Sequence, residues 1–146
     1  MSAISGELSK KILEVVPPCM ERLREELRSS CGNISELSVP QLRVLGCIKR
    51  DLVLVGDIAK HQGVSQPAMS KMVDVLVDKG YVERFEPKKD RRQVPLRLTK
   101  RGSTLYAKIW QSAEVKIVES HLPKLSHEEQ LSLLKALDLL KTLFLT

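Results

Sequence analysis

Aromatic residues are scarce in this chain, and the features that mark many enzymes and metal sites are missing. Phe, Trp and Tyr make up 3% of the 146 residues, so a hydrophobic core must be built from aliphatic side chains. The three cysteines are widely spaced without a CxxC pair, which argues against a disulfide framework and a zinc finger. The sequence has no GxSxG, P-loop or HExxH motif, and its histidines show no metal-ligand spacing. We therefore expect no catalytic residues, no metal and no cofactor, and a protein that is not an enzyme.

Long apolar runs are also missing. No stretch approaches 18 consecutive apolar residues, so the sequence predicts no membrane span and no membrane partner. The first residues, MSAISGELSKK, lack the apolar run of a signal peptide. Hydrophobic residues make up 42% of the chain, enough for a core and too many for a disordered chain. We expect one domain of a soluble, cytoplasmic protein.

The positive charge of the chain is concentrated in one segment. The formal net charge is +6, and the sequence pI is about 9.3. Residues 84–101 contain eight basic and two acidic residues, so this segment alone carries the whole excess. A basic patch of this kind favours a polyanionic partner such as nucleic acid.

The two ends of the chain read as apolar helices. Residues 8–27 have apolar residues at helical spacing, and Pro17-Pro18 predicts a kink or two shorter helices meeting there. Residues 29–38 read as a loop. Residues 99–120 predict a long helix that Pro123 ends, and a capping box beginning at Ser126 opens a leucine-rich last helix. Its leucines cover most of the circumference, so we expect the two ends to pack together and against a second copy.

The middle of the chain alternates short helices with two strand-like runs. A helix is predicted from Pro40, a short apolar run at 52–55 reads as a strand, and a short helix covers 57–62. After Gly63, a helix runs from Ser65 to Lys79, with Met69, Met72, Val73 and Leu76 as its buried stripe and Gly80 as its stop. Strands are predicted at 81–85 and 94–98, and Pro95 places its strand at an edge.

The helix after Gly63 has the properties of a DNA-reading helix. A helix-turn-helix needs a tight turn and a second helix whose outer face is small and polar, because small residues let the backbone approach base edges. Amide, hydroxyl and ammonium groups can then bond to bases or phosphates. An ordinary amphipathic surface helix is the alternative. The candidate DNA-binding residues of this helix are Gln66, Pro67, Ala68, Ser70 and Lys71.

The segment between the two strands is a charged hairpin tip. Its candidate DNA-binding residues are Lys88, Lys89, Asp90, Arg91 and Arg92. Taken alone, such a run is typical of a solvated loop. Following a capped helix and flanked by strands, it favours the wing of a winged helix, in a fold that is mainly α with a small β-hairpin.

The chain resembles the MarR family of winged helix-turn-helix transcription regulators. The resemblance lies in LSVPQLRVL (37–45), DIAKHQGVSQPAMSKMVDVLVDKGYVERF (57–85) and DRRQVPLRLTKRG (90–102). It implies a single domain, with a DNA-binding core at 37–102 and dimerisation helices at 1–30 and 103–146. It also implies that the helix at 65–79 enters the major groove, and that Arg92, oriented by Asp90, reaches the minor groove. Pro95 departs from the family, which usually has a ladder-forming residue there.

The resemblance further implies partners and a means of control. Double-stranded DNA with an inverted repeat and a second copy of the chain are the expected partners. Family members often sense a phenolic ligand, a metal or an oxidant, so we expect a small-molecule effector, which the sequence does not identify.

Cys19 lies where the family's organic-peroxide sensors carry their thiol, but its place on the apolar stripe of the first helix favours a small buried hydrophobic side chain. Cys31, in the predicted loop, would be more exposed. A winged-helix protein-interaction module without specific DNA binding, or a thiol-based redox-sensing regulator, is the alternative function.

Overall fold

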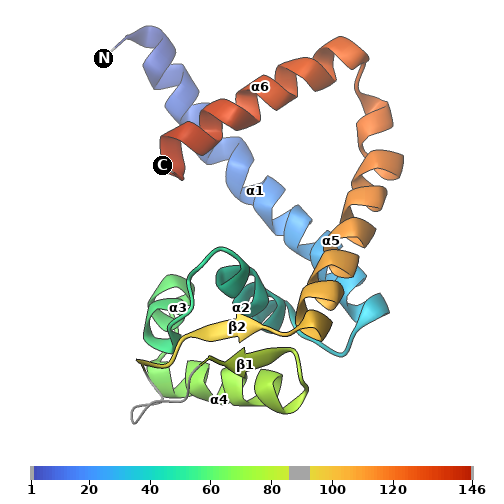
Figure 1. Cartoon of the computed structure of the whole chain (residues 1–146). Helices are drawn as coiled ribbons and strands as arrows, with labels where there is room; N and C mark the ends of the chain where they lie inside the picture. The colour runs from blue at the N-terminus through green and yellow to red at the C-terminus, as the bar shows by residue number, and fades with distance from the viewer. Residues whose placement is uncertain (1, 86–92, 146) are drawn as a thin grey trace. The chain divides into compact units, whose positions relative to one another are not determined.

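The computed structural model describes residues 2–85 and 93–145 and is mainly helical, with one two-stranded antiparallel sheet in the described part (Figure 1). The chain forms two compact units, residues 1–110 and 111–146. None of the described helices is long and apolar enough to cross a membrane. In chain order the elements are α1 (Ala3–Ile34), α2 (Val39–Lys49), α3 (Val55–Gln62), α4 (Gln66–Asp78), β1 (Val82–Arg84), β2 (Leu96–Leu98), α5 (Lys100–Ser120), the 3₁₀ helix η2 (Leu122–Lys124) and α6 (His127–Phe144).

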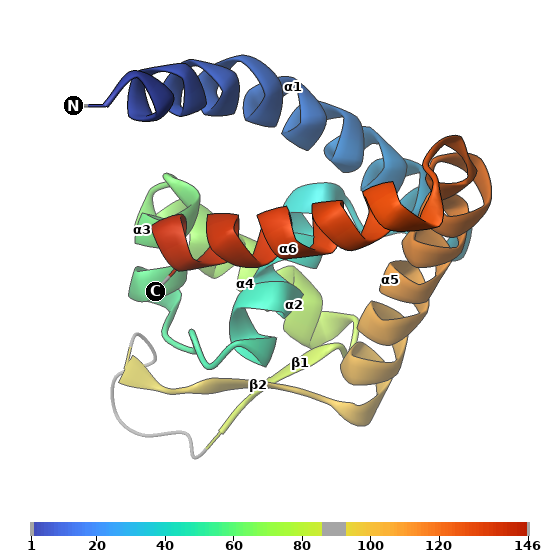
Figure 2. The same cartoon turned by 90° about the horizontal axis from the view of Figure 1, so that it is seen from above.

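The first helix is longer and more continuous than the sequence predicts. Pro17 and Pro18 lie inside α1, so the expectation of two shorter helices is wrong. Each proline removes one helical N–H, and the carbonyls that lose these donors belong to Leu13 and Glu14, which are exposed and accessible to water. Figure 2 shows α1 as one helix that curves along its length.

The predicted loop at 29–38 begins six residues too early, because the loop starts at Ser35. α1 continues to Ile34, and Cys31 is buried within its last turns, so the expectation of an exposed Cys31 is wrong. The Cys31 thiol donates to the Leu37 carbonyl over 3.0 Å, and the N–H of Ser35 caps the helix by donating to the Cys31 carbonyl. Burial of apolar surface against the core therefore outweighs the loop-forming tendency of Ser, Gly and Asn here.

The helices of the central part begin and end where turn and cap residues predict. Ser38 forms a capping box with Gln41 at the start of α2. Gly63 follows α3 in the left-handed conformation (φ 68°), which glycine adopts without a steric penalty. The predicted strand at 52–55 is wrong. Only the Val53 carbonyl joins the sheet edge, by accepting from the N–H of Leu96 over 2.9 Å, and Val55 already begins α3.

The hairpin is shorter than predicted but has the expected pairing. β1 and β2 are antiparallel, with Val82 opposite Leu98 and Arg84 opposite Leu96. Pro95 lies just before β2, and its carbonyl accepts from the N–H of Phe85 over 2.8 Å. Since proline has no N–H to donate, the regular ladder begins one residue later.

The core of the first unit is built from aliphatic side chains, as the scarcity of aromatics predicts. α3 contacts α4, α4 contacts β1, and α2 contacts β2 and α1, so one cluster joins these six elements, and it also includes Ile109 from α5. Each large apolar side chain buried there stabilises the fold by about 1.5–3 kcal/mol. The largest fully buried side chains are Leu45, Ile58, Met69, Leu76, Leu96 and Ile109.

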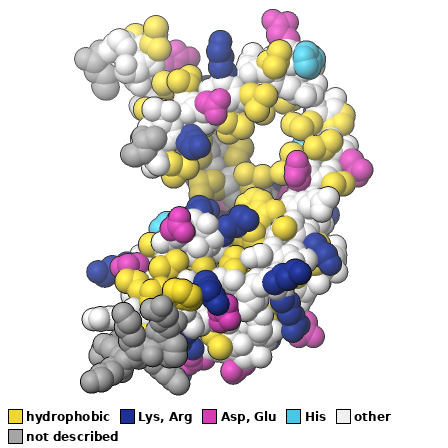
Figure 3. Space-filling model, viewed as in Figure 1, with side chains coloured by type: hydrophobic (Ala, Val, Ile, Leu, Met, Phe, Trp, Pro, Cys, Tyr) yellow, Lys and Arg dark blue, Asp and Glu magenta, His cyan; other side chains and the backbone are white. Residues whose placement is uncertain are grey.

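The second unit contains the end of α5, η2 and α6. The capping box of α6 is present: the Glu129 carboxylate accepts from the N–H of Ser126, and the Ser126 hydroxyl accepts from the N–H of Glu129. Figure 3 shows hydrophobic side chains at the surface along α6. Six of its leucines and its only phenylalanine are exposed by 42% or more, namely Leu131, Leu133, Leu134, Leu137, Leu139, Leu143 and Phe144.

Candidate nucleic-acid interface

The helix-turn-helix consists of α3, a turn at Gly63 and α4. The Ser65 hydroxyl caps α4 by accepting from the N–H of Ala68, and Pro67 occupies the first turn, as predicted. Ile58 on α3 and Met69 and Val73 on α4 are fully buried in the shared core. The apolar stripe of α4 therefore fixes which face of the helix points outward.

The predicted reading residues divide into two groups. Pro67, Ala68 and Lys71 are exposed on α4, whereas Gln66 and Ser70 are half-buried. The Gln66 carboxamide lies over Gly56 of α3, because a Cβ at Gly56 would be 3.7 Å from the Gln66 Oε1. The exposed side chains near the start of α4 are therefore those of one cation, Lys71, and of two small apolar residues, Pro67 and Ala68.

The predicted wing residues Lys88, Lys89, Asp90, Arg91 and Arg92 lie outside the described part of the chain.

The root of the hairpin is described and carries its own arginine contacts. Arg97 forms an ion pair with Glu83 across the two strands, and its guanidinium lies 4.6 Å from the centre of the Phe85 ring. These three side chains hold the described ends of the hairpin together.

An ion pair between α4 and β1 was missed from the sequence. The Nη2 of Arg84 lies 2.7 Å from Oδ1 of Asp74, which is exposed on α4 one turn after Ser70. The sequence does contain both residues, but ten positions separate them, and no periodic pattern marks such a pair. Its geometry depends on how β1 packs on α4.

The LTKRG segment (98–102) holds the start of α5 against the turn that follows α4. The Thr99 hydroxyl donates to the Gly80 carbonyl over 2.6 Å and accepts from the N–H of Gly102 over 3.0 Å. Gly102 lies so close to Tyr81 that a Cβ there would be 2.0 Å from the Tyr81 carbonyl oxygen. Gly80 has φ 78°, which explains why glycine follows α4. The threonine and both glycines thus fix the path from α4 through the hairpin to α5.

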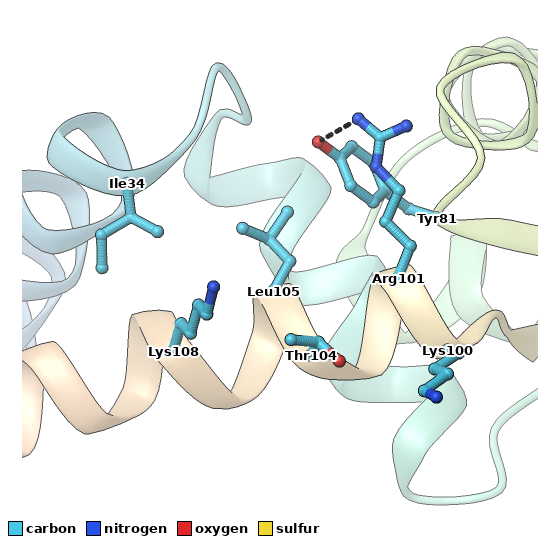
Figure 4. Close-up of a pocket in the computed structure, with 7 residues that line it drawn as sticks. All are labelled: Ile34, Tyr81, Lys100, Arg101, Thr104, Leu105 and Lys108. Carbon is cyan, nitrogen blue, oxygen red and sulfur yellow. Dashed lines mark hydrogen bonds between the residues drawn. The ribbon is translucent and has the colours of Figure 1, made fainter.

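A groove of about 550 Å³ lies beside the start of α5 (Figure 4). Arg101, Leu105 and Lys108 project from α5 toward Ile34 and Tyr81, and the Arg101 guanidinium lies 4.8 Å from the centre of the Tyr81 ring. None of the described residues that line the groove is acidic. It therefore combines apolar side chains with three cationic ones, Lys100, Arg101 and Lys108.

The cysteines differ in accessibility. Cys19 is exposed in α1, so its interpretation as a buried hydrophobe is wrong for a single copy of the chain. Cys47 is buried, like Cys31. Within residues 2–85 and 93–145, no group of three or more His, Cys, Asp or Glu side chains is placed to hold a metal ion.

Comparisons with known proteins agree with this winged helix-turn-helix. The chain is 30% identical over 115 residues to the uncharacterized HTH-type transcriptional regulator YfiV of Bacillus subtilis (strain 168), covering 75% of this chain and 71% of YfiV. The crystal structure of YusO from Bacillus subtilis has a TM-score of 0.67 at 25% identity, covering 97% of this chain and 99% of YusO.

Two further solved structures share the fold. MarR from Listeria monocytogenes 4b F2365 gives a TM-score of 0.74 at 18% identity, over 97% of both chains. A mutant of MarR from E. coli, crystallised in complex with operator DNA, gives 0.62 at 21% identity, over 95% of this chain and 99% of that one. A sequence model of the MarR family matches residues 35–93. The chain belongs to the MarR family and has the winged helix-turn-helix fold of its transcription regulators.

Proposed function

We propose that this chain is a sequence-specific DNA-binding transcription regulator and not an enzyme. The observation that carries the proposal is α4, whose first turns expose Pro67, Ala68 and Lys71 and which packs against β1, in a chain whose sequence between the two strands is strongly basic. The fold is shared with the E. coli MarR mutant crystallised with operator DNA, which supports the same partner here. In this proposal α4 reads the major groove, Gln66 and Ser70 turn toward base edges, and Arg92 enters the minor groove beside Asp90.

The roles of α4 and the wing are distinguished by two substitutions. Arg92→Ala is expected to weaken binding on all sequences and to lower the salt dependence, whereas Gln66→Ala is expected to change which bases are preferred. Both are measured by fluorescence anisotropy on a fragment selected from genomic DNA and on a scrambled control. An Arg92→Ala protein that binds like the parent at every salt concentration contradicts the minor-groove role.

The proposed DNA-binding form is a homodimer built from residues 1–30 and 103–146. The exposed apolar residues of α6, with Leu8, Leu13 and Leu23 of α1, are far more numerous than a monomer's surface normally carries. Two copies present two α4 helices to an inverted repeat about one helical turn apart, near 34 Å. Sedimentation equilibrium tests this: a monomer at micromolar concentration contradicts it.

A winged-helix module that binds protein without DNA is the alternative function. The concentration of all net positive charge in residues 84–101 favours DNA. A gel shift with mixed genomic fragments separates the two, because the absence of retardation at low salt supports the protein-binding module.

Control by a small effector is the second part of the proposal. The groove beside α5 offers Arg101 and Lys108 over the apolar Ile34 and Leu105, which suits a small organic anion. Calorimetric titration with benzoate tests this assignment. Lys108→Glu is expected to bind benzoate more weakly than the parent, and equal heats of binding for the two proteins would contradict the assignment.

Oxidation of a thiol is the alternative mode of control. The exposed Cys19 is accessible to peroxide, so peroxide should release DNA from the parent and not from Cys19→Ser. Equal release from both proteins excludes Cys19 as a sensor.

A further inference from the structure

The outward face of α4 carries a negative charge where a DNA-facing helix should avoid one. The Asp74 side chain is 52% exposed and follows Lys71 by three residues, so it lies on the same side of the helix. A carboxylate at this position is repelled by nearby phosphates. On charge alone, removing it should strengthen DNA binding.

The partner of Asp74 gives this carboxylate a second property. Arg84 is the last residue of β1, and its side chain is only 19% exposed. Its Nη2 donates to the Asp74 Oδ1 over 2.7 Å, the length of a strong charge-assisted hydrogen bond. Its Nε is buried without a partner among the described residues. Without Asp74, this largely buried guanidinium would lose the one hydrogen-bond partner that it has among the described residues. It would then tend to move.

The ion pair joins the two elements that the proposed function places on DNA. β1 is three residues long, and the chain leaves it for the basic tip one residue after Arg84, at Phe85. The second described ion pair of the hairpin, Arg97 with Glu83, links β1 to β2 and leaves α4 untouched. Among the described ion pairs, only Asp74 with Arg84 ties the hairpin to α4 at the point where the tip departs.

We propose that Asp74 and Arg84 are a positioning pair that sets the angle between α4 and the strands of the hairpin, so that Asp74 strengthens DNA binding despite its negative charge. This inference rests on the proposed function. The pair orients the hairpin so that α4 and the basic tip can engage one DNA duplex together, and neutralisation of Asp74 by Arg84 offsets the repulsion from phosphates.

The test compares two substitutions of the same charge on the same helix. Asp74→Asn removes the bridge without changing side-chain size, and Asp78→Asn removes an exposed carboxylate one turn later. We expect Asp74→Asn to weaken operator binding about tenfold and to lower the slope of log Kd against log salt by about one, because a phosphate contact of the wing is lost. Asp78→Asn should bind as tightly as the parent or more tightly. If Asp74→Asn also does so, the proposal is overturned.

Two further measurements separate positioning from folding and from the proposed function. Arg84→Gln should weaken binding like Asp74→Asn, and the double variant should bind no worse than either single variant, because both remove one interaction. Hydrogen exchange without DNA should be faster at the amides of 82–85 and 96–98 in Asp74→Asn than in Asp78→Asn, while the amides of α2 stay protected. If the parent binds no DNA, the proposed function is wrong. The hydrogen-exchange experiment does not depend on DNA, so equal exchange rates of the hairpin amides in Asp74→Asn and Asp78→Asn would overturn the positioning role separately.

Discussion

Gly102 offers the sharpest test of how α5 is joined to the winged part. Its backbone lies against Tyr81 so closely that a Cβ would be 2.0 Å from the Tyr81 carbonyl oxygen, whereas ordinary contact begins at 3.4 Å. Gly102→Ala therefore requires α5 and the Tyr81 backbone to separate by about 1.4 Å. The obstacle is backbone, which cannot rotate away as a flexible side chain could.

The energy of this change follows from the contacts around Gly102. Forcing the added methyl group into this packed site lowers the free energy of unfolding by about 1–3 kcal/mol. The shift also weakens the bonds from Thr99 to Gly80 and from Thr99 to Tyr81, each worth about 1 kcal/mol. Alanine regains about 1 kcal/mol of helix propensity over glycine. We therefore expect Gly102→Ala to lower the free energy of unfolding by about 2–4 kcal/mol.

The assay is urea unfolding followed by circular dichroism, with Gly6→Ala as the matched control. Gly6 also lies in a helix, α1, but nothing lies within 4 Å of a Cβ there, so alanine should be neutral or slightly stabilising. The midpoint of Gly102→Ala should fall well below those of the parent and Gly6→Ala. If both variants unfold at the same urea concentration, the close approach of α5 to Tyr81 does not exist.

The other predictions concern the core, a helix cap and the exposed leucines. Met69→Ala should cost about 2–5 kcal/mol of stability in the same urea experiment, because its fully buried side chain would leave a cavity, and a smaller loss than for exposed Lys71→Ala contradicts this. Ser126→Ala should cost about 0.5–2 kcal/mol, measured by thermal unfolding, and Ser126→Asp should restore it. Leu137→Lys should shift the dimer toward monomer in sedimentation equilibrium, whereas Lys135→Ala should not.

The sequence predicted the elements whose boundaries depend on local chemistry. Ser65 and Ser126 cap their helices, and Gly63 and Gly80 adopt positive φ, because each of these signals acts within a few residues. The buried stripe of α4 is confirmed for Met69, Val73 and Leu76, while Met72 is half-buried against the same core, since helical spacing alone determines which residues share a face.

The sequence failed where distant contacts decide. α1 continues to Ile34 and buries Cys31, because packing against α2 and the core outweighs the local preference for a loop. The pairing of Asp74 with Arg84 and the half-burial of Gln66 over Gly56 likewise depend on how separate elements pack. The helix-turn-helix could thus be located from the sequence, but the surface it presents required the structure.

The most direct test of the account is DNA binding by the full chain. Genomic fragments retained by the protein at low salt are sequenced, and the affinity of a selected fragment is measured by fluorescence anisotropy as salt rises from about 50 to 200 mM. We predict retention of fragments that share an inverted repeat, with binding that weakens about a thousandfold over this range. Failure to retain any fragment at low salt, or equal affinity for a scrambled repeat, would contradict the account.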